Sequence, residues 1–594
     1  MCGIIGYIGD KPAQPILLNC LRRLEYRGYD SCGIAVAAGS IGVYKDAVRV
    51  AELAKVAPRL NGTAGIGHTR WATHGEPSQV NAHPHLDCSG KIAVVHNGVI
   101  NNFQRLKRQL TAEGHSFVSE TDTEVISHLI EKYYDGNLEK AVEAALSDID
   151  GSYAIIVLVA GESKLVAARK DSPLIIGVSD RENFIASDVP AILDYTNRVI
   201  YLEEGDIGVV TKDNIKIRRY GAEVVGKEHK ILWSVEDAQK GGYEHFMLKE
   251  IHEQPKVIRD TLGEYISAAE TEVKLAMMTE ANLEGMLIVA CGTSYHAALV
   301  GRYIVEELVG IPVRSELACE FTYRHQIPAG TAAIVVTQSG ETADTLKAMK
   351  RLKEGGCQVV AITNVVGSTA SRIADQTVYT RAGPEISVAA TKSFTAQLMV
   401  LYWLALSYSR VDIRQVDNLT MGLRQLPEKV QQVLDNEDKI RQYASYLSRY
   451  ENVFFISRGI NYPVALEGAL KLKEISYIHA EGYAAGELKH GPFALLGANT
   501  PVIAIVAQDN TYETMLTNIK EVKARGSPLM ALAEEGDEAI GELADSVITV
   551  PRVDAIFSPV VNTVALQLLA YYTAQQRNCP IDFPRNLAKS VTVE

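Results

Sequence analysis

The stretch Met286–Ala290 (MLIVA), followed by Cys291–Ser294 (CGTS), decides the fold of the larger part of this 594-residue chain. Five consecutive apolar residues predict a strand that is buried on both faces, and the short polar loop after it leads into a predicted helix. The runs Ala332–Val336 and Val359–Thr363 repeat this order of strand and helix. Such alternation predicts a parallel, doubly wound α/β sheet.

The same pattern recurs further along the chain. Val453–Ser457 and the loop Arg458–Asn461 mirror the first strand and its loop, and Pro501–Val506 mirrors Ala332–Val336. An internal repeat of this kind predicts two similar domains, at 275–415 and 440–582. The remaining tail, 583–594, has no periodic apolar pattern, so we expect it to be disordered or to cover a site.

The first 220 residues have a different character. Short apolar runs at Ile92–His96, Tyr153–Val159 and Leu165–Ala168 are separated by turn residues and predict strands. Two helices are expected between them, at 13–24 and 123–134. The pattern predicts a layered α+β domain over 1–230, and a polar, glycine-containing stretch predicts a linker over 231–270.

The composition is typical of a soluble globular protein, with 47% hydrophobic and 22% charged residues. The formal net charge of −13, without a basic stripe, argues against a nucleic-acid partner. The eight cysteines form no CxxC pair, which argues against zinc and disulfides and favours a reducing, cytoplasmic setting. The longest apolar stretch, Gln397 to Ser409, is too short to span a bilayer. We therefore expect no metal, no cofactor, no signal peptide and no membrane contact.

Cys2 is the second residue of the chain. Removal of Met1 would leave a thiol and a free α-amine on one residue. An α-amine has a reference pKa of roughly 7.7–8.0, which suits it to accept the thiol proton near neutral pH. The alternative is a buried cysteine in a first strand, because the residues up to Ile8 are apolar.

Several polar clusters would support a nucleophile at Cys2. Arg70–Gly75 (RWATHG) contains a bidentate carboxylate binder beside an aromatic residue and a histidine. Asn97 and Gly98 follow the predicted strand and could form an oxyanion hole, or simply a hairpin-type turn. Asp122 could cap the helix that follows or bind an α-ammonium group.

Together with Leu24–Ser31 (LEYRGYDS), these clusters resemble the class II glutamine amidotransferases. That family belongs to the N-terminal-nucleophile hydrolases, whose fold is a four-layer α/β/β/α sandwich. The resemblance implies that Cys2 attacks the glutamine carboxamide and that Asn97 and Gly98 stabilise the oxyanion. It also implies a set of residues at the glutamine pocket: Arg27 (which orients Cys2), Arg70 (α-carboxylate), Trp71 (the gate of an ammonia channel), Thr73, His74 and Asp122 (α-amine).

A phosphate loop is predicted in the second half of the chain. Thr337–Thr342 (TQSGET) lies between a strand and a helix, where backbone N–H groups and hydroxyls can hold an anion, although Ser339 could also serve only as a helix cap. The companion loop at Ser294 offers more donors. This loop resembles that of the SIS (sugar isomerase) domain. The second copy reads Ala507–Asn510 (AQDN), so it lacks two hydroxyls and carries a carboxylate, and only the first copy should bind phosphate.

Further chemical groups gather in the second copy. Lys471 and Glu474 are three residues apart on a predicted helix, so their side chains share one face. The alternative is that they form only a surface salt bridge. The loop Glu481–Pro492 is rich in charge and glycine and contains His490. The tail adds Lys589, and a lysine in an apolar site can form a Schiff base.

Over its whole length the chain resembles the family of glutamine–fructose-6-phosphate aminotransferases (isomerising), also called glucosamine-6-phosphate synthases. The resemblance implies transfer of the glutamine amide nitrogen to D-fructose 6-phosphate. The products are D-glucosamine 6-phosphate and L-glutamate, in the first step of UDP-N-acetylglucosamine synthesis. It implies that Glu474 moves a proton between C1 and C2 with help from Lys471. Lys589 would form the Schiff base, and His490 from the neighbouring subunit of a homodimer would open the sugar ring. Fructose 6-phosphate would be held by Ser294, Thr337, Gln338, Ser339, Thr342 and the backbone of Val388.

This sequence departs from the family pattern at two positions. Thr337 stands where serine is usual and keeps the hydroxyl, whereas Ala390 stands where serine is usual and loses one contact to the sugar. Two other hypotheses compete with the synthase. One is a phosphosugar deglycase or isomerase with an attached glutaminase. The other is a regulatory protein that senses sugar phosphates, which would not need Glu474, His490 and Lys589 together.

Overall fold

The computed structural model describes residues 2–231, 239–266, 285–324 and 332–592. The chain divides into two units. The first contains the N-terminal residues together with Glu341–Ala343 and the final segment from Ala588, and the second contains the remainder. Each unit is described by itself.

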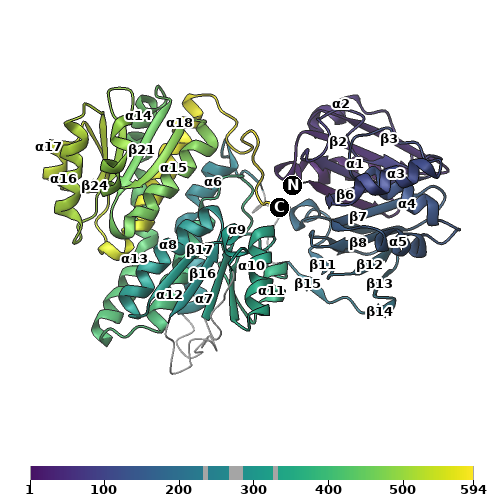
Figure 1. Cartoon of the computed structure of the whole chain (residues 1–594), viewed down its shortest axis with the longest axis horizontal. Coiled ribbons are helices and arrows are strands. Elements are labelled where there is room, and N and C mark those ends of the chain that lie inside the picture. Colours follow the sequence, from purple (N-terminus) through teal and green to yellow (C-terminus); the bar gives the residue numbers. More distant parts are fainter. Residues whose placement is uncertain (1, 232–238, 267–284, 325–331, 593–594) are drawn as a thin grey trace. The chain divides into compact units, whose positions relative to one another are not determined.

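The first unit is built on two antiparallel sheets (Figure 1). The eight-stranded sheet has the order β15-β11-β9-β10-β1-β4-β2-β3, and the seven-stranded sheet has the order β14-β13-β12-β8-β7-β6-β5. The strands of the first sheet are β1 (Gly3–Ile8), β2 (Ser31–Ala37), β3 (Ile41–Asp46), β4 (Ala64–Arg70), β9 (Ile175–Val178), β10 (Asn183–Ala186), β11 (Arg198–Tyr201) and β15 (Glu228–Lys230). Those of the second are β5 (His85–Leu86), β6 (Ile92–Ile100), β7 (Gly151–Val159), β8 (Leu165–Lys170), β12 (Asp206–Val210), β13 (Ile215–Arg219) and β14 (Ala222–Val224).

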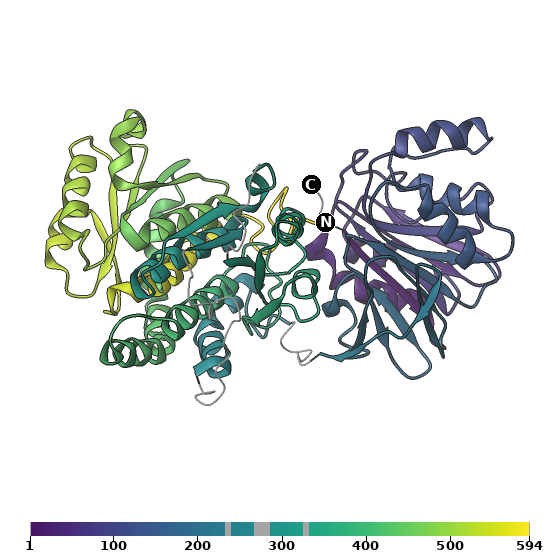
Figure 2. The same cartoon turned by 60° about the horizontal axis from the view of Figure 1, so that its bottom comes forward.

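Helices cover the outer face of each sheet, which gives four layers, as expected. Helices α1 (Ala13–Arg22) and α2 (Val50–Val56) pack on the first sheet. The second sheet is covered by α3 (Phe103–Ala112), α4 (Glu124–Tyr133) and α5 (Leu138–Ser147), of which α4 and α5 contact its strands (Figure 2).

The inner strands are apolar on both faces because successive side chains point alternately into two different cores. In β6, Ala93 and Val95 belong to the core between the two sheets, whereas Ile92 and Val94 belong to the core beneath the helices. In β1, Gly6 faces the second sheet so closely that an added Cβ would lie 3.1 Å from a methyl carbon of Leu165. A strand buried on both faces needs this uninterrupted apolar sequence.

Two expectations for this unit were wrong. The described part of the unit has five α-helices rather than two. The unexpected ones are α2, which has 7 residues, α3, which is largely polar with Leu106 and Leu110 as its buried residues, and α5. The strand expected to end before Asn97 continues to Ile100, and Asn97 and Gly98 pair with Ala154 and Tyr153 of β7. They therefore do not form a hairpin turn.

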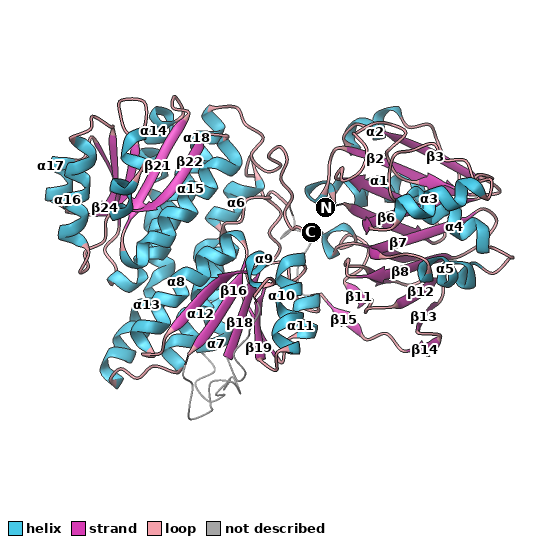
Figure 3. Ribbon diagram, in the orientation of Figure 1, coloured by secondary structure: helices cyan, strands magenta, loops and turns pink. Residues whose placement is uncertain are grey.

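The second unit contains two five-stranded parallel sheets, as the repeat predicted (Figure 3). Their orders are β17-β16-β18-β19-β20 and β22-β21-β23-β24-β25, which are the same order in two copies. The first consists of β16 (Met286–Ala290), β17 (Val313–Leu317), β18 (Ala332–Thr337), β19 (Gln358–Thr363) and β20 (Gln376–Tyr379). The second consists of β21 (Asn452–Ser457), β22 (His479–Ala484), β23 (Val502–Ile505), β24 (Leu529–Glu534) and β25 (Ser546–Val550).

One apolar core joins the two sheets of this unit. It contains Ile288 of β16 and Phe455 of β21, together with side chains from the helices between the sheets. The helices of the unit are α6 (Phe246–His252), α7 (Gln254–Ile266), α8 (Gly292–Leu308), α9 (Ala318–Phe321), α10 (Ala343–Glu354), α11 (Thr369–Ile373), α12 (Lys392–Ser407), α13 (Ile413–Asp435), α14 (Glu437–Leu447), α15 (Tyr462–Ser476), α16 (Tyr512–Lys523), α17 (Glu538–Leu543) and α18 (Ser558–Gln576).

The apolar stretch near Gln397 is the buried helix α12, but a longer apolar helix occurs at α18. Among the described residues, the stretch Ala555–Gln576 is long and apolar enough to cross a membrane by length and composition. Its most apolar window is 94% buried inside the fold, which is also the pattern of a core helix in a soluble protein.

Candidate active sites

Cys2 lies at the start of β1, opposite the end of β4, because Gly3 pairs with Thr69. Its Sγ accepts a hydrogen bond from the backbone N–H of Trp71 at 3.2 Å. Burial raises the pKa of the thiol, and the Trp71 N–H and the Arg70 guanidinium oppose that rise. The thiol therefore needs a base to take its proton before it can act as a nucleophile.

Asn97 reaches Cys2 from the second sheet, and Gly98 is the next residue of the same strand. The Asn97 Nδ2 donates to the carbonyl oxygen of Cys2 at 2.7 Å. Gly98 has φ +136°, and a Cβ there would lie 2.1 Å from the carbonyl oxygen of Ser152. Only glycine fits this backbone position, which keeps the strand close to its neighbour beside the thiol.

Arg70 and Asp122 complete this group. The Arg70 guanidinium lowers the pKa of Cys2 and the Asp122 carboxylate raises it. The Nη2 of Arg70 donates to the carbonyl oxygens of His74 and Gly75, and its Nη1 is buried without a hydrogen-bond partner among the described residues. An incoming carboxylate would satisfy that orphaned donor.

Asp122 does not cap the helix that follows it. Its Oδ2 accepts the backbone N–H of Ile100 at 2.8 Å, and the N-cap position of α4 is Thr123, which makes no side-chain capping bond. The carboxylate is therefore fixed against the end of β6.

The remaining predicted residues of this site lie in different settings. Arg27 is buried and forms an ion pair with Asp188. Thr73 is exposed, and its hydroxyl lies 3.4 Å from the Nδ1 of His74. The ring of Trp71 packs edge-on against Tyr29.

In the second unit, the predicted phosphate loop lies at the reversal point of the strand order. The sheet runs outward from β16 to β17 on one side and from β18 onward on the other. The loops after β16 and β18 therefore open at the carboxyl ends of the two strands between which the order reverses. That is where doubly wound sheets bind ligands.

The residues of this loop are held in a tight conformation. The Oγ1 of Thr337 accepts the N–H of Gly340 at 3.2 Å, which closes the loop and leaves the hydroxyl proton free to donate. Gly340 has φ +70°, and a Cβ there would lie 2.1 Å from the Oγ of Ser368. The carbonyl of Gln338 accepts the N–H of Asn364, and Ser339 and Thr342 follow in the same loop. Nearby in the first copy, Ser294 accepts a hydrogen bond from Gln397 at 2.9 Å.

The corresponding loop of the second copy is already occupied by its own carboxylate. Asp509 accepts both the N–H and the hydroxyl of Thr511, at 2.7 and 2.6 Å. A carboxylate in this position would repel a phosphate.

Lys471 and Glu474 form a buried ion pair rather than a surface one. The Nζ of Lys471, which is 1% exposed, lies 2.7 Å from Glu474 Oε2 and 3.4 Å from Glu467 Oε1. Burial by itself would lower the pKa of Lys471, but the two carboxylates outweigh it and raise that pKa. Lys471 is therefore held as an ammonium group.

Three residues that the sequence reasoning did not assign join this network. Glu467 accepts hydrogen bonds from Thr293 at 3.0 Å and pairs with His296 at 2.7 Å, and Lys471 donates to the Thr293 hydroxyl at 3.0 Å. Glu467 is four residues before Lys471, so helical spacing could have indicated it. Thr293 and His296 come from the first copy, which no local pattern could connect to Lys471.

The other predicted residues of the sugar site are more separate. His490 ends the 3₁₀ segment Ala485–His490 and is exposed. The backbone N–H of Val388 donates to the carbonyl of Asp582 at 3.1 Å, so its carbonyl is the group that a sugar would meet. Lys589 lies in the final segment, which belongs to the first unit, and its place at the sugar stays a prediction.

Comparison with known families identifies the domains in which these residues lie. The SIS domain model matches residues 281–407 and 446–576, and the glutamine amidotransferase domain model matches residues 68–194. The C-terminal domain of glucosamine-fructose-6-phosphate aminotransferase from Francisella tularensis superposes with a TM-score of 0.56 at 38% identity, over 58% of this chain and 100% of that one.

Curated relatives match from end to end. The glutamine–fructose-6-phosphate aminotransferase [isomerizing] of Caldanaerobacter subterraneus subsp. tengcongensis is 51% identical over 608 residues, with 100% of both chains covered. The proteins of that name from Methanosarcina acetivorans and Pyrococcus horikoshii are each 50% identical, again over 100% of both chains. The chain therefore belongs to the family of glutamine–fructose-6-phosphate aminotransferases (isomerizing).

Proposed function

We propose that this chain transfers the amide nitrogen of L-glutamine to D-fructose 6-phosphate and isomerises the product to D-glucosamine 6-phosphate. One observation carries the proposal. A single chain holds Cys2, with Asn97 hydrogen-bonded to its carbonyl oxygen, and a buried Lys471–Glu474 pair together with a loop of the type predicted to bind phosphate. An enzyme that only hydrolysed glutamine would not need the second site, and an enzyme that only isomerised a sugar phosphate would not need Cys2.

The first half-reaction is acyl transfer at Cys2. After removal of Met1, the α-amine of Cys2 takes the thiol proton, and the sulfur attacks the carboxamide carbon. Asn97 and Gly98 stabilise the oxyanion of the tetrahedral intermediate, while Arg70 and Asp122 hold the substrate's α-carboxylate and α-amine. Collapse of the intermediate returns the proton to the leaving nitrogen and releases ammonia, and water then hydrolyses the thioester to glutamate.

The second half-reaction takes place on the phosphosugar. Ser294, Thr337, Gln338, Ser339 and Thr342 would hold the substrate with the backbone of Val388. His490 opens the ring, Lys589 forms a Schiff base at the ketone, and Glu474 carries a proton between C2 and C1. The raised pKa of Lys471 keeps it protonated beside Glu474, so Lys471 is not the base of this step.

Coupling the two half-reactions has a chemical reason. Ammonia is mostly protonated in neutral water and then cannot attack an imine, so passage without exposure to solvent keeps it nucleophilic. We propose that Trp71 gates this passage. The proposal includes a cytoplasmic homodimer in which the partner's His490 completes each sugar site. It also includes a division into a glutaminase domain (1–230), a linker (231–270), two SIS domains (275–415 and 440–582) and a tail (583–594).

Product analysis tests the function directly. The purified protein is incubated with glutamine and fructose 6-phosphate, and a Cys2→Ala variant serves as the control. We expect equal amounts of glucosamine 6-phosphate and glutamate, both lost in the variant. Glutamate without amino sugar would contradict the proposal and favour a deglycase or isomerase with an attached glutaminase.

A second measurement tests the coupling. Synthesis is compared with glutamine and with added ammonia as the nitrogen source, and glutamine hydrolysis is measured with and without fructose 6-phosphate. We expect glutamine to be the better source. Equal synthesis from external ammonia, together with unrestrained hydrolysis in the absence of sugar, would rule out a protected passage.

A further inference from the structure

A group of metal-binding side chains lies in the first unit, on residues that the glutamine site does not use. Cys88 comes from the turn after β5, His115 from the segment between α3 and α4, and His128 and Glu131 from α4. Each offers one ligand atom, and the four atoms lie within 4.8 Å of one another. The cluster therefore joins two loops to one helix.

The spacing of these atoms suits one small cation. Cys88 Sγ lies 3.5 Å from His128 Nδ1 and 3.8 Å from His115 Nδ1. Glu131 Oε2 lies 2.8 Å from His115 Nδ1 and 3.2 Å from His128 Nδ1. Zinc bonds of ~2.0–2.3 Å at the tetrahedral angle place ligand atoms about 3.3–3.6 Å apart. Small side-chain movements would bring all four atoms to that spacing.

The surroundings of His128 prepare it to act as a ligand. Its side chain is 1% exposed. Its second nitrogen, Nε2, is buried without a hydrogen bond to any residue that the structure describes, and it faces Glu124 Oε1 at 3.8 Å. Glu124 is itself fixed by the backbone N–H groups of Val118 and Ser119 and by the Ser119 hydroxyl. A carboxylate behind the outer nitrogen of a histidine is the usual support of a metal-binding imidazole.

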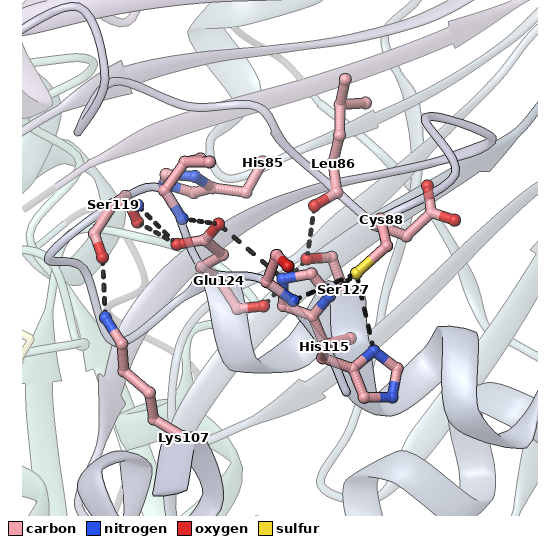
Figure 4. Close-up of polar contacts among 12 residues, drawn as sticks. His85, Leu86, Cys88, Lys107, His115, Ser119, Glu124 and Ser127 are labelled. Atoms are coloured by element: carbon pink, nitrogen blue, oxygen red, sulfur yellow. Dashed lines mark hydrogen bonds and ion pairs between the residues drawn. The ribbon is translucent and has the colours of Figure 1, made fainter. Parts of the chain in front are cut away.

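Figure 4 shows the two parts of this arrangement. The sulfur of Cys88 points toward the ring of His115, and Glu124 is held by Ser119 on the other side. Among the four candidate ligands, His128 thus faces a second layer of polar groups, formed by Glu124 and Ser119. A chance meeting of surface side chains would not require that layer.

We propose that Cys88, His115, His128 and Glu131 form a structural zinc site. Thiolate, imidazole and carboxylate are all zinc ligands, and four protein ligands close the coordination shell, as in sites that stabilise a fold rather than catalyse. Binding displaces the thiol proton of Cys88 to solvent, and both histidines bind as neutral imidazoles through Nδ1. Zinc would tie the loops of Cys88 and His115 to α4, the helix that begins two residues after Asp122.

Zinc binding by the full-length protein tests the site. The protein is stripped with a chelator, titrated with Zn²⁺ against a chromophoric chelator, dialysed and analysed for metal content. A Cys2→Ala background removes the nucleophilic thiol as a competing ligand. We expect about one tightly held zinc per chain, and a thiolate charge-transfer band with tetrahedral d–d bands when Co²⁺ replaces it.

Two matched cysteine variants decide the outcome. Cys88→Ala should weaken zinc binding at least ~10-fold and remove the charge-transfer band, while Cys319→Ala, in the second unit, should leave both unchanged. Zinc should raise the melting temperature of Cys319→Ala and not of Cys88→Ala. If Cys88→Ala does not fold, His115→Gln replaces it in the same comparison.

Two results would overturn the proposal. One is equal zinc binding by Cys88→Ala and Cys319→Ala, which would place the metal elsewhere. The other is the lack of a charge-transfer band in the Co²⁺-substituted parent protein, which would mean that the Cys88 thiolate does not bind the metal. Glu131 would then only bridge the imidazoles of His115 and His128 by hydrogen bonds. A further variant, Glu124→Gln, should weaken binding about 10–100-fold if it supports His128.

Discussion

Gly98 is the residue at which the glutamine site should tolerate least change. A Cβ at this position would lie 2.1 Å from the Ser152 carbonyl oxygen and would force β6 away from β7. Asn97, the predicted oxyanion donor, is the preceding residue of that strand. We therefore expect Gly98→Ala to lower the rate of glutamine hydrolysis by at least about 100-fold, measured as glutamate release.

Gly161→Ala is the control for that prediction. Gly161 also has a positive φ, +81°, but an added Cβ would meet nothing within 4 Å. The strained backbone should cost roughly 1–2 kcal/mol of unfolding free energy without a change in hydrolysis. Equal loss of activity in both variants would mean that Gly98 acts only through general destabilisation.

Glu467 is the residue that we expect to set the protonation of Lys471. Together with Glu474 it raises the Lys471 pKa against the effect of burial. A raised lysine pKa keeps the ammonium form as the pH rises, so removal of the Glu467 charge should let Lys471 lose its proton at lower pH. For Glu467→Gln we expect the alkaline limb of the pH–rate profile of amino-sugar synthesis to move to lower pH.

The measurement uses ammonia as the nitrogen source, so that the glutamine site does not contribute to the profile. Glu521→Gln serves as the control, because Glu521 pairs with the surface residue Lys489. Glu521→Gln should leave the profile unchanged, because exposed pairs contribute little. An unshifted alkaline limb in Glu467→Gln would show that Lys471 does not titrate in the rate-limiting step.

At the scale of elements, the two parallel sheets provide a comparison within one molecule. They have the same strand order, and each has a loop after its third strand in sequence, but the loops differ in chemistry. The first contains Ser339 and the glycine turn at Gly340, and the second contains Asp509, which accepts hydrogen bonds from Thr511. With the same topology, the first loop is therefore predicted to bind an anion and the second to exclude it.

Exchange of one residue between the loops should separate the two roles. Ser339→Asp places a negative charge at a helix N-terminus where phosphate should bind, and we expect the KM for fructose 6-phosphate to rise at least ~10-fold. Asp509→Ser removes the carboxylate from the second loop and should leave that KM unchanged, with about 1 kcal/mol lost from its hydrogen bonds to Thr511. Equal KM values for both variants would place the phosphate elsewhere.

At the scale of the whole molecule, the question is whether His490 completes the sugar site of its own chain or that of the partner chain in a dimer. It lies on an exposed 3₁₀ segment, whereas Glu474 is in a largely buried network. Mixing two inactive variants, His490→Asn and Glu474→Gln, answers this. In a two-fold dimer with shared sites, each heterodimer has one intact site, so random mixing should restore about a quarter of the parent activity.

The mixed sample is unfolded and refolded, or coexpressed, before activity is measured. Each variant mixed with itself is the control and should remain inactive. If His490 serves its own chain, no combination of the two variants contains an intact site. The absence of recovery in verified heterodimers would therefore contradict the shared-site dimer.

The sequence by itself determined the fold class, the internal repeat and most of the residues proposed for chemistry. Strands such as Met286–Ala290 were predictable because burial on both faces demands an unbroken apolar run, whose limits are visible locally. The helices α2 and α3 were missed, because α2 has only 7 residues and α3 is largely polar, with Leu106 and Leu110 as its buried residues.

Only the tertiary structure decided how those residues combine. Asn97 lies within a strand, and Asp122 accepts a hydrogen bond from the backbone of Ile100. Thr293 and His296 of the first copy contact Glu467 of the second copy. The tertiary structure also gathered Cys88 with two histidines and a glutamate, although the cysteine spacing had predicted no metal. Contacts between distant segments depend on the packing of sheets and helices in three dimensions. Spacing along the chain carries no record of them.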